Sequence, residues 1–213
     1  MNVSPALAQR FIDDALRNDH NRAILQRLPA LGLPDAWLVA GCLFQTVWNL
    51  QAGRTPDAGI RDYDLFYFDG SDLSEAAEAA VGARVQALLA DRGIVVEAKN
   101  QARVHTWYRA WFGHDYPALG CARDGIDRFL VAGTCVALQP GPHGPVLYAP
   151  YGLDAIYQGV LAPNPLCNHR ALYLRKAADY AARWPGLRLT MATTATTATT
   201  ETTGTTGATT TSR

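Results

Sequence analysis

The segment WLVAGCLFQTVWNL, residues 37–50, decides how the fold begins. Its first four residues, Trp37 to Ala40, form a short apolar run between Pro34 and Gly41, which is typical of a buried strand. After Gly41 the apolar side chains repeat at helical spacing, in Leu43, Phe44, Val47, Trp48 and Leu50. The segment therefore predicts a strand, a tight glycine turn and a helix in succession.

Segments on both sides of this unit alternate between helical and extended patterns. Two helices are expected before residue 32, a strand over 62–68, a helix through 77–89 and one long strand over 94–108. Residues 128–138 and 146–149 predict a hairpin, and 151–160 and 169–183 predict two helices. Because strands and helices mix without a regular strand–helix–strand repeat, we expect the α+β class.

Residues 190–213 differ in composition from the rest of the 213-residue chain, since they are almost entirely Thr, Ala and Gly. Such a tract has no large apolar side chains to offset the entropy lost on ordering, so we expect a disordered tail. Residues 1–189 are expected to form one domain with a substantial core.

Overall charge and apolar content limit the partners and the compartment. The chain has 19 basic and 19 acidic side chains, whereas proteins that grip nucleic acid through phosphates usually have a basic excess. We therefore favour a small molecule or a protein as the acceptor. The four cysteines lack metal-binding spacing, the N-terminus lacks a signal-peptide pattern, and the longest apolar run is too short to cross a bilayer. A cytoplasmic protein without a membrane partner is the expectation.

Asp62 and Asp64 form a D-x-D pattern at the start of an aromatic-rich strand. Side chains alternate faces along a strand, so both carboxylates should point the same way. Two neighbouring carboxylates repel each other, and Mg²⁺ removes that cost because it takes oxygen ligands. The alternative is a pair of solvated aspartates at the end of a strand.

The stretch that begins at Glu97 predicts a polar strand face. In an unbroken strand over 94–108, Glu97, Lys99 and Arg103 would share one face. Glu97 could then complete a carboxylate cluster, with Lys99 or Arg103 contacting phosphate oxygens. The alternative is a polar face that meets only water.

The Gly41-Cys42 turn is the third candidate feature. Glycine lets the backbone approach a ligand closely, and a helix that begins there presents free N–H groups to phosphates. A plain tight turn is the alternative. The last helix adds a locally basic face, Arg170, Arg175, Lys176 and Arg183, which suits either solvent or phosphate.

Taken together, these motifs resemble a known family. The blocks WLVAGCLFQTVWN (37–49), RDYDLFYFD (61–69), VEAKNQARVHTWY (96–108) and YAPYGLDAIYQGVLAPNP (148–165) resemble a bacterial nucleotidyltransferase-like family, once a domain of unknown function. That family is part of the DNA polymerase β-like nucleotidyltransferase superfamily, and the likeness covers roughly residues 30–188.

The resemblance implies a palm-type mixed β-sheet backed by helices and a Mg²⁺-dependent transfer from a nucleoside triphosphate, with Mn²⁺ as an alternative metal. Asp62 and Asp64 would bind metal and triphosphate, Glu97 would complete the metal site or activate the acceptor, and Gly41-Cys42 would cradle the phosphates. Lys99 and Arg103 would neutralise phosphate charge.

The chain departs from the superfamily pattern in two ways. Cys42 replaces the usual Ser or Gly, and the gap from Gly41 to Asp62 is longer than usual. Three alternatives therefore stay open: a degenerate protein that binds a nucleotide or partner without chemistry, a regulatory or toxin-type enzyme acting on tRNA or protein, and an interaction domain.

Overall fold

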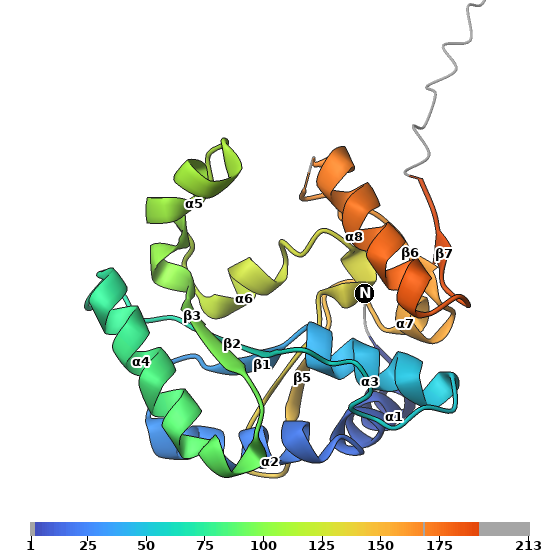
Figure 1. Ribbon diagram of the computed structural model, residues 1–213, viewed down its shortest axis with the longest axis horizontal. Helices are drawn as coiled ribbons and strands as arrows, with labels where there is room; N and C mark the ends of the chain where they lie inside the picture. Colours follow the sequence, from blue (N-terminus) through green and yellow to red (C-terminus); the bar gives the residue numbers. More distant parts are fainter. Residues whose placement is uncertain (1–2, 168, 192–213) are drawn as a thin grey trace, which may run out of the picture.

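The computed structural model describes residues 3–167 and 169–191 (Figure 1). Its α-helices are α1 (Pro5–Leu16), α2 (Asp19–Arg27), α3 (Gly41–Gln51), α4 (Glu75–Leu88), α5 (Val104–Phe112), α6 (Ala122–Ile126), α7 (Asp154–Tyr157) and α8 (Arg170–Arg183). Its strands are β1 (Trp37–Val39), β2 (Tyr63–Tyr67), β3 (Val96–Asn100), β4 (Ala137–Gln139), β5 (Val146–Tyr148), β6 (Val160–Leu161) and β7 (Arg188–Leu189). The tail expected from residue 190 lies outside the described residues, apart from Thr190 and Met191.

The main sheet has five strands in the order β3-β2-β1-β4-β5. β2 and β3 run parallel, whereas the β1–β2, β1–β4 and β4–β5 pairs are antiparallel. β6 and β7 form a separate two-stranded parallel sheet. A mixed sheet backed by helices confirms the predicted α+β class, and the predicted succession of strand, turn and helix over residues 37–51 is also confirmed.

The two faces of β2 and β3 have different environments. Tyr63, Leu65 and Tyr67 are buried on one face together with Val96 and Ala98 of the neighbouring strand. The intervening side chains on both strands are partly or fully exposed on the other face. In Figure 1, α1, α2 and α4 lie on one side of the sheet, and α5, α6 and α8 rise on the other. The open face is therefore the one that carries the polar residues of the two strands.

The long strand expected over 94–108 is wrong beyond Asn100. The Asn100 side chain accepts hydrogen bonds from the backbone N–H groups of Ala102 (3.1 Å) and Asp69 (3.0 Å), and donates to the Asp69 carbonyl (2.8 Å). It thus caps a 3-10 turn, Gln101–Arg103, which leads directly into α5. Residues beyond Asn100 consequently do not share a strand face with Glu97 and Lys99.

Aromatic side chains fasten the C-terminal helix α8 to α3. Phe44 and Trp48 of α3 pack against Tyr180 of α8 with ring centroids 5.4 Å apart in each pair. Trp184, which follows α8, lies 5.4 Å from Trp48. These contacts hold α8 beside the helix that begins at the glycine turn.

No helix in the described part of the chain combines the length and apolar character that crossing a membrane requires.

Candidate active site

The β1–α3 turn and the start of β2 lie next to each other because their strands pair. Val39 is opposite Asp64 in the antiparallel β1–β2 register. Besides burial, the charges of Asp64 and Asp62 both raise the pKa of the Cys42 thiol, so the turn lies near both carboxylates. Ala40, at the turn, has φ +47°, a backbone conformation that non-glycine residues rarely adopt. The chain thus turns sharply from the strand into α3 beside the aspartate pair.

Glu97 lies on the same face of the sheet as the aspartate pair. Asp64 and Glu97 are partners in the parallel β2–β3 register, and partners in a register point to the same side. Asp62 is exposed, Asp64 is partly buried, and Glu97 is exposed. Nζ of Lys99, on the same face, is 3.4 Å from a carboxylate oxygen of Glu97. The three acids are therefore neighbours along one open face.

The electrostatics of Asp64 show how close these acids are. Burial, together with the smaller effects of the charges on Asp62 and Glu97, raises the pKa of Asp64 to about 6. Lys176 and Lys99 act in the opposite direction. An ionised Asp64 thus lacks full compensation, and a cation would supply it.

Over residues 3–167 and 169–191, no three His, Cys, Asp or Glu side chains converge closely enough to form a ready-made metal site. The oxygen ligands fit a hard cation in chemistry. They would complete its coordination together with phosphate oxygens, as Mg²⁺ sites commonly do.

Two of the expected phosphate-binding cations differ in placement. Lys99 stands on the acidic face, paired with Glu97. Arg103 instead lies in the 3-10 turn after β3, where its guanidinium is 2.6 Å from Glu78 of α4 and donates to the Leu73 carbonyl at 3.0 Å. The strand break at Asn100 is the reason, because it redirects Arg103 toward α4.

Lys176 of α8 is a cation of this site whose role the sequence left open. Its charge lowers the pKa of Asp64, and its ammonium lies 5.2 Å from the centre of the Tyr180 ring. In the sequence it was only one member of a basic helix face, which suited solvent equally well. Its proximity to Asp64 depends on how α8 folds back over the sheet.

Cys42 does not present its thiol at the turn. The side chain is fully buried, and Sγ lies 3.7 Å from the Val39 carbonyl. Burial raises the pKa of the Cys42 thiol well above its usual value, and the charge of Asp64 adds to this. At this position the thiol therefore offers no donor to a ligand.

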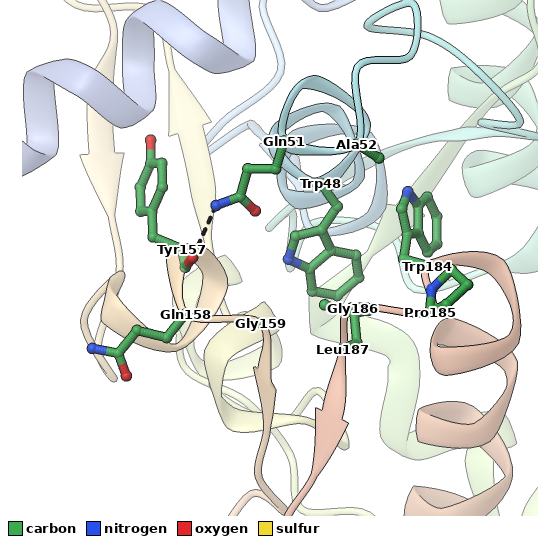
Figure 2. A pocket seen from close by; sticks show the side chains of 10 residues that line it. All are labelled: Trp48, Gln51, Ala52, Tyr157, Gln158, Gly159, Trp184, Pro185, Gly186 and Leu187. Carbon is green, nitrogen blue, oxygen red and sulfur yellow. Dashed lines mark hydrogen bonds between the residues drawn. The ribbon is translucent and has the colours of Figure 1, made fainter.

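An apolar cavity of about 310 Å³ lies at the opposite end of α3 (Figure 2). Trp48, Ala52, Trp184 and Leu187 line it, and none of its lining side chains is charged. Gln51 spans one side and donates to the Tyr157 carbonyl at 2.8 Å. A highly charged phosphate ligand would find no counter-charge in this cavity.

A mixed sheet with carboxylates beside a glycine turn is the arrangement that the sequence resemblance implied, and a comparison with known families supports a nucleotidyl-transfer class of protein. Residues 26–189 match the family model described as nucleotidyltransferase, so the chain belongs to that family and is a nucleotidyltransferase. This confirms the resemblance drawn from the sequence motifs.

A solved structure described as "The NMR structure of the protein reveals a CCA-adding enzyme head domain" shares the fold. The TM-score is 0.70 at 23% identity, and the match covers 86% of this chain and 95% of that one. The search of curated proteins gave no significant match.

Proposed function

We propose that this protein transfers a nucleoside monophosphate from a nucleoside triphosphate to an acceptor, with Mg²⁺ or Mn²⁺ bound by Asp62, Asp64 and Glu97. One observation supports this most strongly: Asp64 and Glu97 are register partners on an open sheet face. Asp62 precedes Asp64 by two residues, and the start of α3 lies beside them. Clustered oxygen ligands next to a helix N-terminus suit a metal–triphosphate complex.

Each residue has a role that follows from its environment. Asp64, partly buried, would hold the cation firmly, whereas the exposed Asp62 and Glu97 can adjust to it. Bound Mg²⁺ would offset phosphate charge and stabilise the attacking and leaving oxygens. Lys99 and Lys176 would offset charge that develops on the leaving group. Glu97, half exposed, can also accept the proton of an acceptor hydroxyl.

The acceptor we favour is a small molecule or a protein, because the formal net charge of the chain is zero. Purified protein should be incubated with each labelled nucleoside triphosphate and a cell extract, with and without Mg²⁺. Labelled product would identify both the donor nucleotide and the class of acceptor.

Asp64→Asn is the decisive variant for the proposed function, since it keeps the shape of the side chain and removes its charge. We expect it to lower transfer at least about 100-fold, because a lost metal ligand removes several kcal/mol of transition-state stabilisation. Asp115→Asn is the matched control, because Asp115 is 82% exposed in a surface ion pair with Arg109. Full transfer by the Asp64 variant would remove the assignment.

A second candidate function is binding of a nucleotide without chemistry. The buried thiol of Cys42 favours it, since the turn lacks the hydroxyl donor expected at this position. Such a protein would bind nucleotide in calorimetry and release no pyrophosphate in the presence of Mg²⁺.

A further inference from the structure

The N-terminus of α3 lies at the glycine turn and lacks a donor from the buried Cys42 thiol. The helix has 11 residues, and no side chain caps its first turn. The N–H groups of Leu43 and Phe44 both bond to the Ala40 carbonyl. The N–H group of Gly41 precedes them at a partly exposed residue, so it is the one that a bound anion would meet.

Gln45, one turn further along α3, directs its amide nitrogen toward Gly41. A methyl group added to Gly41 would lie 3.1 Å from Nε2 of Gln45, so the glycine leaves room for the amide. Gln45 is only 8% exposed. Among the hydrogen bonds of the described residues, Nε2 donates to none, and it is not one of the fully enclosed atoms without a partner. The Gln45 side chain is thus nine-tenths buried, while its amide nitrogen stays accessible and free to donate to a ligand.

Arg183 of α8 fixes which way the Gln45 amide points. Its Nη2 atom is 2.9 Å from Oε1 of Gln45 and 2.7 Å from the Gly59 carbonyl. A guanidinium only donates hydrogen bonds, so the amide atom that faces it must be the carbonyl oxygen. The NH₂ group of Gln45 is therefore turned the other way, toward Gly41.

We propose that Gln45 donates a hydrogen bond to a phosphate oxygen of the triphosphate, and that Arg183 is the positioning residue that holds its amide in the donating orientation. The inference rests on the proposed function and adds a residue to it. Gln45 supplies the side-chain donor that the buried Cys42 thiol does not. The ligand chemistry is a phosphate oxygen, irrespective of the nucleobase.

Inorganic tripolyphosphate with Mg²⁺ is the probe, because it carries the phosphates and requires no knowledge of the base. Its affinity is measured by calorimetry on the full chain. Gln45→Glu keeps a partner for Arg183, loses the donor and adds a negative charge. We expect its affinity to fall at least about tenfold, the effect of one lost hydrogen bond to a charged group, with the melting temperature unchanged or raised.

Gln51→Glu makes the same chemical change on the same helix, at a residue whose amide contacts Tyr157, and should bind like the wild type. Gln45→Leu removes the donor and should weaken binding. Arg183→Met should also weaken binding, because the Gln45 amide is no longer held in place. The double variant should bind about as weakly as Gln45→Leu alone, because the two residues act through one hydrogen bond.

Binding by Gln45→Glu within about twofold of the wild type would overturn the inference and leave the proposed function intact. Absence of Mg²⁺-dependent tripolyphosphate binding by the wild type would overturn it as well. The transfer assay with Asp64→Asn then decides separately on the proposed function.

Discussion

At the scale of single residues, Asp64 carries a charge that the fold does not fully compensate. Its carboxylate is partly buried beside two other acids, and the nearest positive charges, Lys176 and Lys99, lower its pKa only in part. A residue that destabilises the free protein while suiting a bound cation is a common feature of functional sites. The loss of unfolding free energy that this charge causes in the metal-free protein can be measured.

Asp64→Asn should stabilise the metal-free protein at neutral pH. The pKa of Asp64 is about 6 when folded, compared with 3.8 as the ordinary value. The folded protein therefore holds the proton more tightly, and ionising Asp64 costs stability as the pH rises from about 4 to about 6. Above pH 6 the cost is at most about 3 kcal/mol, at 1.36 kcal/mol per pKa unit. Urea unfolding of both proteins in EDTA, from pH 4 to 8, measures it.

The two unfolding curves should approach each other toward about pH 4 and meet below it, where the carboxyl group becomes protonated in both folded and unfolded chains. Adding Mg²⁺ at pH 7.5 should raise the melting temperature of the wild type and leave that of the Asn variant unchanged. Equal stability of the two proteins at every pH would contradict the environment described for Asp64.

Alternation along one strand was enough to predict that Asp62 and Asp64 point the same way, because that pattern depends only on local geometry. It could not place Glu97, which meets Asp64 through the pairing of β2 with β3. Gln45 and Lys176 were beyond such reasoning. Each depends on α8, whose return to the sheet is a long-range contact. The sequence offers one local indication for Gln45, which is a polar residue in a helix whose side chains are mostly apolar and buried.

At the scale of elements, Asn49 joins α3 to the loop before β2. Its buried amide nitrogen donates to the carbonyls of Pro56 (3.2 Å) and Ala58 (2.9 Å), and its oxygen accepts from Trp184 Nε1 (2.9 Å). The loop that leads to Asp62 is therefore held from inside the core. One side chain couples the helix, the loop and the end of α8.

Asn49→Leu should destabilise the protein by about 3 kcal/mol, because the buried Trp184 N–H and two part-buried carbonyls lose their partner. Hydrogen exchange of residues 53–61 should accelerate more than that of the strands, since the loop loses its anchor. Gln51→Leu is the control on the same helix, with an exposed hydrogen bond and an expected loss below about 1 kcal/mol. Equal losses in the two variants would show that Asn49 does not anchor the loop.

The end of β3 shows why the boundaries of an element could not be predicted from the sequence pattern. Alternation of polar and apolar residues continues past Asn100 through Arg103, so the pattern predicted one strand. The side chain of Asn100 bonds to Asp69 and caps the following turn, which ends the strand. Asn is a preferred cap, but its partner Asp69 lies 31 residues earlier, where local pattern has no information.

At the scale of the whole molecule, α8 completes the site from the far end of the chain. Aromatic packing of Tyr180 and Trp184 on α3 sets its position, which brings the charge of Lys176 near Asp64 and the guanidinium of Arg183 to Gln45. The α+β class could be derived from the order of patterns. The placement of α8 could not, because it follows from packing between helices far apart in sequence.

The charge distribution of the whole molecule leads to a prediction about the acceptor. The chain has zero formal net charge, and Lys99 and Arg103 already pair with Glu97 and Glu78. With no excess of basic over acidic side chains to displace counterions from a nucleic acid, we expect a labelled tRNA to bind more weakly than about 1 µM at about 150 mM salt.

Fluorescence anisotropy between about 50 and about 200 mM salt provides the measurement, because the slope of log K against log salt counts the phosphates neutralised. We expect a slope equivalent to about two phosphates or fewer, whereas a protein that grips tRNA through many contacts would lose about a thousandfold in affinity over this range. Such a steep loss, together with submicromolar binding, would make a nucleic acid the acceptor despite the neutral total. A shallow slope with active transfer would direct the search toward small molecules and proteins.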